Sequence, residues 1–156
     1  MIKNIIDLHM HSGYSDDGEF KPSVLVQMCK EAGLKYIAVA DHNSVKGVEE
    51  AVNKGNELGV KVIPAIEIDC TYEGVNLHVL GYYIDYSLKE FGELEENILE
   101  QEKKASPERL RLVEETGIYV NRDKLSKIAK NGIIIGEDIA EASVYEPENK
   151  DNPLIK

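Results

Sequence analysis

Short apolar runs alternate with helix-like segments through the first 86 residues, and this alternation limits the folds open to the chain. It is typical of parallel strands joined by crossover helices, so we expect an α/β fold. The expected strands cover residues 2–9, 36–41, 60–68 and 77–83. Pro22 at a first helical position and Gly33 as a stop bracket one helix. Ser44 as an N-cap and Gly59 as a stop bracket the next.

The character of the sequence changes after Tyr86, where Glu and Lys become dense and apolar residues take a helical spacing. The expected helix boundaries there are Ser106 with Pro107, Gly117, Asn121 and Gly132, with one more helix over residues 137–142. We therefore predict two parts, residues 1–86 and residues 87–156, the second ending in a polar tail.

Composition excludes several classes of protein. The chain has no leader pattern and no apolar run of the roughly 18 residues that a membrane span needs, so we expect a cytoplasmic protein without a membrane partner. Cys29 and Cys70 are too few for a disulfide framework and are expected to be small buried hydrophobes. The net charge of −11 opposes binding of long duplex nucleic acid. An anionic substrate would need local positive charge, which bound divalent cations can supply.

Four parallel strands do not close a barrel, because the commonest closed form needs about eight. The last expected strand would therefore leave an open sheet edge. We expect that the helical part covers this edge, that another copy covers it through self-association, or that the chain is a fragment of a longer protein.

The chain has four histidines, and each lies at or just past the end of an expected strand. His9 and His11 alternate in extended backbone, which points both imidazoles to one side. Asp16 in the following turn can add an oxygen ligand to this pair. His42 follows the second strand beside Asp41, a carboxylate that could accept its second N–H or orient another ligand.

Two further polar residues interrupt the later apolar strands. Glu67 lies in a buried run, where an unpaired carboxylate is costly, so it needs a metal or a cation beside it. His78 lies alone in an apolar strand. Taken singly, His78 could be a hydrogen-bonded core residue, Asp16 a turn residue, His42 part of a helix cap and Glu67 the partner of a Lys or Arg. Together at one edge of one sheet, they favour a shared metal site.

These residues resemble the motifs of the polymerase and histidinol phosphatase (PHP) family. The matching segments are Asp7 to Ser12 with Ser15 and Asp16, Ala40 to Asn43, Pro64 to Ile68, and Leu77 to Tyr82. The resemblance covers residues 5–86, and the helical part resembles an insertion of phosphatase and nuclease members.

The resemblance implies an incomplete distorted β/α barrel of the seven-stranded PHP type that holds two or three divalent ions, commonly zinc, manganese or iron. By motif position the implied metal ligands are His9, His11, Asp16, His42, Glu67 and His78, with Glu67 bridging two ions. Family members have glycine directly after the aspartate, whereas Asp17 follows Asp16 here, so either carboxylate could be the ligand. Counting from His9 favours Asp16.

Family members also supply another histidine and an Asp-x-His pair from later strands, and this chain has no histidine after His78. Catalysis is therefore expected of the complete protein.

The leading functional hypothesis is a metal-dependent phosphoesterase. Its ions would activate a water, and the resulting hydroxide would attack the phosphorus of a small phosphorylated metabolite, a nucleotide or a short oligonucleotide. His42 or Asp16, where free of metal, would protonate the leaving oxygen. The alternatives are a histidinol-phosphatase-like enzyme, a non-catalytic metal-binding module and the PHP domain of a DNA polymerase. Arg109, Arg111 and Arg122 are expected on solvated helix faces and not at a phosphate.

Overall fold

The computed structural model describes residues 5–155, apart from the side chain of Asn131, and it confirms an α/β fold. The first elements are β1 (Ile6–Met10), α1 (Pro22–Ala32), β2 (Tyr36–Val39), α2 (Val48–Leu58), β3 (Lys61–Val62), β4 (Ala65–Tyr72) and β5 (Val75–Tyr82). They are followed by α3 (Lys89–Glu115), α4 (Arg122–Ile128) and α5 (Gly136–Glu141), with short 3-10 turns at Lys130–Gly132 and Pro147–Asn149. No helix among the described residues is long and apolar enough to cross a membrane.

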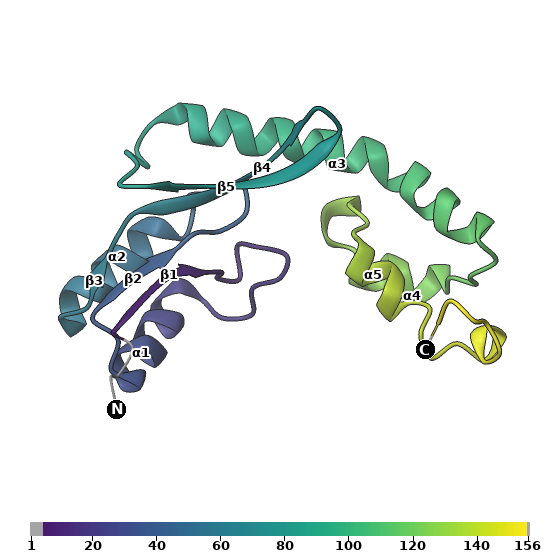
Figure 1. Cartoon of the computed structure of the whole chain (residues 1–156), viewed down its shortest axis with the longest axis horizontal. Coiled ribbons are helices and arrows are strands. Elements are labelled where there is room, and N and C mark those ends of the chain that lie inside the picture. The colour runs from purple at the N-terminus through teal and green to yellow at the C-terminus, as the bar shows by residue number, and fades with distance from the viewer. Residues whose placement is uncertain (1–4, 156) are drawn as a thin grey trace. The chain divides into compact units, whose positions relative to one another are not determined.

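A three-stranded parallel sheet in the order β1-β2-β3 forms the base of the first part of the chain (Figure 1). Helices α1 and α2 pack together against one face of this sheet through a buried cluster that includes Val26, Ile37, Val39, Ala51 and Val62. The opposite face carries a second cluster built from Ala38, Ala40, Ile63 and Ala65, with Leu8 and Leu80 packed against it. The parallel strands and both crossover helices follow the sequence prediction.

The fourth expected strand does not join this parallel sheet. β4 and β5 form an antiparallel hairpin whose register runs from Ala65 opposite Tyr82 to Tyr72 opposite Val75. The turn consists of Glu73 at φ 50 and Gly74 at φ 78. Two residues with positive φ make a tight hairpin, whereas a parallel crossover needs about a dozen residues or more. The shortness of this turn excludes the expected parallel arrangement.

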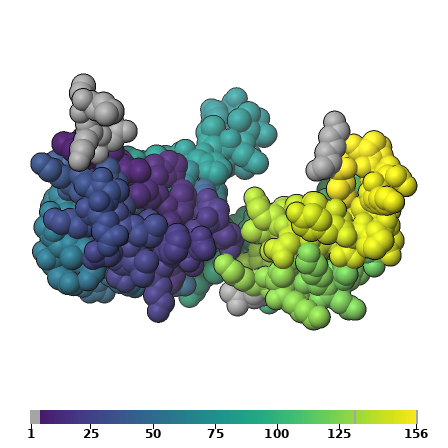
Figure 2. Space-filling view, turned by 90° about the horizontal axis from the view of Figure 1, so that it is seen from below, coloured from purple at the N-terminus to yellow at the C-terminus, as the bar shows by residue number. Residues whose placement is uncertain are grey.

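One face of the hairpin is apolar and exposed. It carries Cys70, Tyr72, Val75, Leu77 and Val79, and the exposed fractions of the last four run from 41% to 66%. The teal segment that projects in Figure 2 belongs to this stretch of the chain. The prediction that Cys70 is buried is therefore wrong, because its side of the hairpin is left uncovered, whereas Cys29 is buried in the cluster under α1.

Several predicted boundaries shift by a few residues. The first strand begins at Ile6, and residues 2–4 of the expected strand lie outside the described residues. The run from residue 60 to residue 68 is divided at Pro64, which cannot donate a ladder hydrogen bond, so it contributes to β3 and β4 separately. Ser44 is not the N-cap of α2. Gly47 holds that position, and the buried Ser44 hydroxyl instead accepts a hydrogen bond from the Lys46 N–H.

The chain divides into two compact units, Met1–Glu95 and Glu96–Lys156, close to the change of character seen at residue 86. The second unit has its own buried cluster of Leu110, Val120, Leu125, Ile139 and Ala142. Whether this unit is an insertion into a barrel stays a prediction.

Within the second unit, Pro107 does not start a helix, because α3 runs through it without a break. The preceding Ser106 is buried, donates to the Glu102 carbonyl and accepts from the Ile134 N–H, and so ties the helix to a neighbouring loop. Asn121 caps α4 as expected, since its side chain accepts from the Lys124 N–H. The three arginines that were expected on solvated helix faces all pair with glutamates: Arg109 with Glu102, Arg111 with Glu108 and Glu115, and Arg122 with Glu114.

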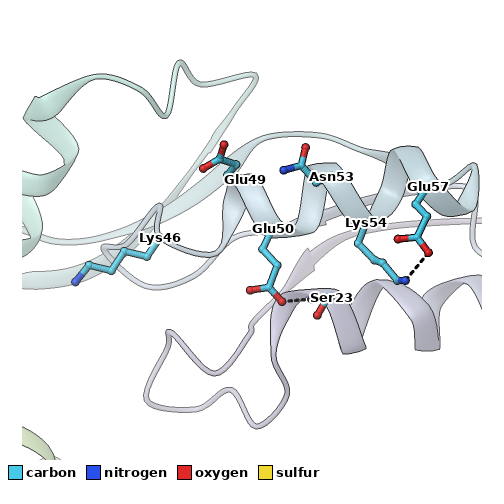
Figure 3. A pocket seen from close by; sticks show the side chains of 7 residues that line it. All are labelled: Ser23, Lys46, Glu49, Glu50, Asn53, Lys54 and Glu57. Carbon is cyan, nitrogen blue, oxygen red and sulfur yellow. Dashed lines mark hydrogen bonds and ion pairs between the residues drawn. The ribbon is translucent and has the colours of Figure 1, made fainter.

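In the groove between α1 and α2, a side chain of α2 caps the N-terminus of α1. Lys21, the N-cap of α1, makes no capping side-chain hydrogen bond, and the Ser23 N–H donates to Glu50 Oε1 of α2 at 3.0 Å (Figure 3). The hydrogen bonds from the side chain and the backbone of Ser23 lower the pKa of Glu50. Glu50 therefore joins the two helices.

We expect Glu50→Ala to lower the free energy of unfolding by about 1 kcal/mol, the usual value of a lost cap. Because the pKa of Glu50 is lower in the folded state, its contribution is full above the ordinary glutamate pKa and disappears as the pH falls through the lowered value. Urea unfolding of the wild type and the variant over a pH series would measure both effects. Glu49→Ala, in the same helical turn, is the control, and an equal loss there would contradict the role of Glu50.

Candidate metal centre

The candidate site is built around the carboxylate of Glu67, which is 2% exposed. The backbone holds this residue where the two sheets meet, because the Glu67 N–H donates to the Asp41 carbonyl and the Asn43 N–H donates to the Glu67 carbonyl. These bonds connect β4 with the end of β2 by a parallel bridge between His42 and Glu67. The site therefore lies where the parallel sheet meets the hairpin and not at the edge of one sheet.

All four histidines surround this carboxylate. Glu67 Oε2 lies 2.7 Å from His9 Nε2, 3.2 Å from His11 Nε2 and 3.7 Å from His42 Nε2. Glu67 Oε1 lies 2.9 Å from His78 Nδ1. The rings follow one another in the order His9, His11, His42 and His78, with neighbouring centroids 4.6 to 5.1 Å apart. The structure thus brings together five of the six residues expected at the site.

The carboxylate of Glu67 is kept ionised by these neighbours. Burial alone would raise the pKa of Glu67, but hydrogen bonds from His9 and His78 and the nearness of His42 outweigh burial and lower it. Among residues 5–155, its ion-pair partners are all imidazoles and include no Lys or Arg. Glu67 is therefore a buried carboxylate that no Lys or Arg of the described residues neutralises, and such a carboxylate was expected to need a metal ion beside it.

The H-x-H pair converges as expected, although its strand is irregular. The register of β1 against β2 shifts between Asp7 and Met10, and the Nε2 atoms of His9 and His11 are 3.1 Å apart. Two nitrogens aimed at one point beside a carboxylate oxygen form a suitable set of donors for a single ion.

Asp41 has a different role from the one expected. It does not accept the second N–H of His42. It is 2% exposed and accepts from the Ser12 N–H at 2.6 Å, the Ser12 hydroxyl at 2.7 Å and the Ser15 hydroxyl at 3.3 Å. Burial raises the pKa of Asp41, although these hydrogen bonds and the nearness of His11 partly offset the increase. Asp41 therefore anchors the loop that carries His11.

Ser15 connects this anchor to two histidines. Its hydroxyl oxygen accepts from the His42 N–H at 2.7 Å and lies 3.2 Å from His11 Nδ1. The loop closes so tightly that a Cβ on Gly18 would lie 1.7 Å from the Ser12 carbonyl oxygen, so the loop as folded accepts only glycine there. The conformation of the loop is thus set by buried contacts near the ligands.

The loop brings Asp17, and not Asp16, to the histidines. The Asp17 carboxylate lies 3.5 Å from His11 Nδ1 and 3.8 Å from His42 Nε2. Among the described residues, Asp16 belongs to none of the groups of three donors that could share an ion. The geometry therefore favours Asp17, whereas counting residues after His9 favours Asp16, and the choice between the two carboxylates stays a prediction.

His78 and Asp69 form the hairpin side of the site. His78 lies in the middle of β5 and not at a strand end. It reaches the site because β5 runs antiparallel to β4, which places His78 directly opposite Asp69. Asp69 Oδ1 lies 2.9 Å from His42 Nδ1 and 3.5 Å from His78 Nδ1. Asp69 was not among the site residues expected from the sequence. Its position two residues after Glu67, on the same face of an extended strand, was the signal that could have found it.

The donors fit a divalent metal. Within residues 5–155, three groups of side chains have ligand atoms within 4.8 Å of one another: His9, His11 and Glu67; His11, Asp17 and His42; and His42, Asp69 and His78. Imidazole nitrogens and carboxylate oxygens are the donors that zinc, manganese and iron take in proteins. The site is therefore a candidate metal centre.

Comparison with known proteins decides the family. The model of the PHP domain matches residues 7–136, which is most of the chain. The chain belongs to the PHP domain family. The resemblance seen in the motifs around His9, His42, Glu67 and His78 is thereby confirmed at the level of the family.

The curated proteins that are similar to this PHP chain include an exoribonuclease and a cyclic phosphate diphosphodiesterase. A 5'-3' exoribonuclease of Haemophilus influenzae is 35% identical over 79 residues, covering 51% of this chain and 28% of that protein. A phosphoribosyl 1,2-cyclic phosphate 1,2-diphosphodiesterase of Eggerthella lenta is 28% identical over 128 residues, covering 81% of this chain and 48% of that protein. The chain spans less than half the length of these two relatives.

Solved structures show the same fold. An amidohydrolase from Chromobacterium violaceum superposes with a TM-score of 0.75 at 22% identity, covering 89% of this chain and 49% of that one. A proposed metal-dependent phosphoesterase from Bifidobacterium adolescentis superposes with a TM-score of 0.65 at 29% identity, covering 88% of this chain and 48% of that one. The described strands thus form part of a PHP-type fold, and they do not close a barrel.

Proposed function

We propose that this chain provides the metal-binding part of a phosphoesterase that hydrolyses a small phosphorylated metabolite, a nucleotide or a short oligonucleotide. The observation that carries the proposal is the buried Glu67 carboxylate with four imidazoles around it, at 2.7 to 3.7 Å. The names of the relatives, an exoribonuclease and a cyclic phosphate diesterase, support phosphate ester chemistry. The net charge of −11 continues to disfavour a long duplex.

The chain's own residues would hold two or three divalent ions of zinc, manganese or iron. His9, His11 and Glu67 would bind one ion. The other carboxylate oxygen of Glu67 would be available to a second ion on the side of His78. His42 and Asp17 would complete the set between them. When bound, such ions supply an activated water and offset the negative charge of the phosphate.

The two ends of the row of histidines are its most exposed members. The side chains of His9 and His78 are 45% and 56% exposed, whereas those of His11 and His42 are 17% and 22% exposed. A phosphate would therefore approach over His9 and His78, with the inner histidines and the Glu67 carboxylate beneath it.

Protonation of the leaving oxygen by His42 or Asp16 stays a prediction. Both ring nitrogens of His42 face carboxylates, Nδ1 toward Asp69 and Nε2 toward Glu67 and Asp17. Asp16 lies outside the groups of described residues that could share an ion.

The test is metal content and hydrolysis measured together. The chain, purified without added metal, should contain zinc, manganese or iron by elemental analysis. The complete product of its gene should hydrolyse a chromogenic phosphate ester or a labelled short RNA, and a chelator should abolish this activity. Asp17→Ala should lower the metal content, and Asp16→Ala is its matched control.

Three outcomes separate the candidate functions. Bound metal without hydrolysis of any ester would favour a non-catalytic metal-binding module. A chain that holds no metal and binds none on titration would contradict the proposal. Hydrolysis limited to histidinol phosphate would favour the histidinol-phosphatase-like alternative.

A further inference from the structure

Asp69 contacts the Nδ1 side of the His42 ring. Asp69 Oδ1 lies 2.9 Å from His42 Nδ1, while His42 Nε2 points the other way, 3.7 Å from Glu67 Oε2 and 3.8 Å from Asp17 Oδ2. Only the Nδ1 contact is short enough for a hydrogen bond. The imidazole therefore has one nitrogen bonded to Asp69 and the other directed toward the candidate ligands.

Asn43 fixes the carboxylate of Asp69 from the side away from His42. Its Nδ2 donates to Asp69 Oδ2 at 2.9 Å, and its Oδ1 accepts from the Asp69 N–H at 2.9 Å. Asn43 is itself 9% exposed, adopts a left-handed backbone at φ 57, and donates its N–H to the Glu67 carbonyl. Asp69 is thus held by a residue that is built into the junction of the two sheets.

The direction of these hydrogen bonds sets the tautomer of His42. An ionised carboxylate only accepts, so the nitrogen that bonds to Asp69 must carry the proton. The lone pair of a neutral ring then lies on Nε2, toward Glu67 and Asp17. The opposite tautomer would place two acceptors against each other at 2.9 Å and would aim its proton at oxygens 3.7 Å away or more.

We propose that Asp69 is a positioning residue that holds His42 as the Nδ1–H tautomer and so presents its Nε2 lone pair to the metal centre. This inference rests on the proposed function, since the lone pair matters there as a ligand. Carboxylates that accept from the far nitrogen of a metal-binding histidine act in this way in many metal sites. Asp69 works through His42 and is not itself counted among the ligands.

The competing role for Asp69 is that of a ligand shared with His42 and His78, whose donor atoms lie within reach of one another. The hydrogen bonds oppose that role. Asp69 Oδ2 is occupied by Asn43, and an ion between Asp69 and His42 would need the lone pair on Nδ1. The two roles therefore need opposite His42 tautomers when an ion is bound, and the tautomer that the hydrogen bonds favour can be observed without any metal.

Asp69→Asn is the sharpest substitution because it keeps the size and removes one acceptor. Asp69 accepts from His42 with one oxygen and from Asn43 with the other, so an amide must turn its NH2 group toward one of these donors. If its oxygen stays on Asn43, the NH2 group faces His42 Nδ1 and favours the Nε2–H tautomer. Asn43→Gly keeps the left-handed backbone and removes the support of Asp69, so it should weaken the preference without reversing it.

The experiment is a long-range proton–nitrogen NMR correlation of the metal-free chain labelled at histidine, at a pH where the rings are neutral. We expect His42 of the wild type to be the Nδ1–H tautomer and Asp69→Asn to shift it toward Nε2–H. Asp85→Asn is the control at an exposed aspartate that accepts hydrogen bonds from Ser87, and it should leave the tautomer unchanged. An Nε2–H tautomer of His42 in the folded wild type would overturn the inference.

Zinc titration of the same proteins tests the consequence. Asp69→Asn should weaken zinc binding by about 10–100-fold, the usual cost of losing a partner behind a metal-binding histidine, with the number of bound ions unchanged. Loss of one bound ion would make Asp69 a ligand and would overturn the positioning role. A wild-type chain with the expected tautomer but no zinc binding would contradict the proposed function and leave the tautomer assignment standing.

Discussion

Glu67→Gln is expected to weaken binding of zinc or manganese by more than about 100-fold, beyond the range typical of a residue that acts behind a ligand. Glutamine has nearly the same shape, but it is neutral and replaces one oxygen by an NH2 donor. Both oxygens of Glu67 are used at once, one beside His9 and His11 and the other beside His78. The substitution therefore removes the shared negative charge and one acceptor from the centre of the cluster.

Calorimetric titration of the metal-free chain with zinc would measure this loss of affinity, and elemental analysis would give the number of bound ions. Glu93→Gln is the matched control, because Glu93 is an exposed glutamate that pairs only locally with Lys89. Far-ultraviolet circular dichroism would show that the variant is folded. If Glu67→Gln kept the full number of ions at wild-type affinity, Glu67 would not be the shared ligand.

Asp41→Ala is expected to lower the free energy of unfolding of the metal-free chain by about 2–4 kcal/mol, since each unsatisfied buried donor costs about 1–3 kcal/mol. The Ser12 N–H loses its acceptor, and the Ser12 and Ser15 hydroxyls lose theirs. Because the Ser15 hydroxyl also contacts His11 and the backbone of His42, the loop and the ligands should move together. Metal affinity should therefore fall in the same variant.

Asp41→Asn is the matched control for this prediction. Its oxygen can still accept from the Ser12 N–H, and the Ser12 hydroxyl can rotate to accept from the new NH2 group. The loss of stability should consequently be smaller than in Asp41→Ala. Urea unfolding and zinc titration of both variants would test the order. Equal effects of the two substitutions would show that the hydrogen bonds of Asp41 do not hold the loop.

The parts of the site that sequence could predict are those marked by a polar residue in an apolar strand. Such positions are held by His9, His42, Glu67 and His78. The three histidines all contact the carboxylate of Glu67. For His9, His42 and Glu67 this follows from local pattern, because strand direction and the period of two bring their side chains together. His78 reaches the same place because β5 pairs antiparallel with β4, which the sequence pattern did not predict.

The parts that sequence could not predict depend on how a loop folds or on which strands pair. Asp16 and Asp17 are neighbours in one turn, and only the conformation of the loop shows which carboxylate faces His11. Asp69 became relevant only once the hairpin placed it opposite His78. Pro107 looked like a helix start because its local signal is strong, whereas packing of Ser106 against the Ile134 loop keeps the long helix continuous. Tertiary contacts outweigh the local signal there.

The two units bury separate clusters of apolar side chains, one set within residues 8–80 and the other within residues 110–142. Each histidine and carboxylate of the metal centre comes from the first unit. Over evolutionary time, substitutions in the second unit can therefore accumulate without being selected against through the metal ligands. Descendants of a common ancestor could lengthen, shorten or exchange that unit and still inherit the same set of candidate metal ligands.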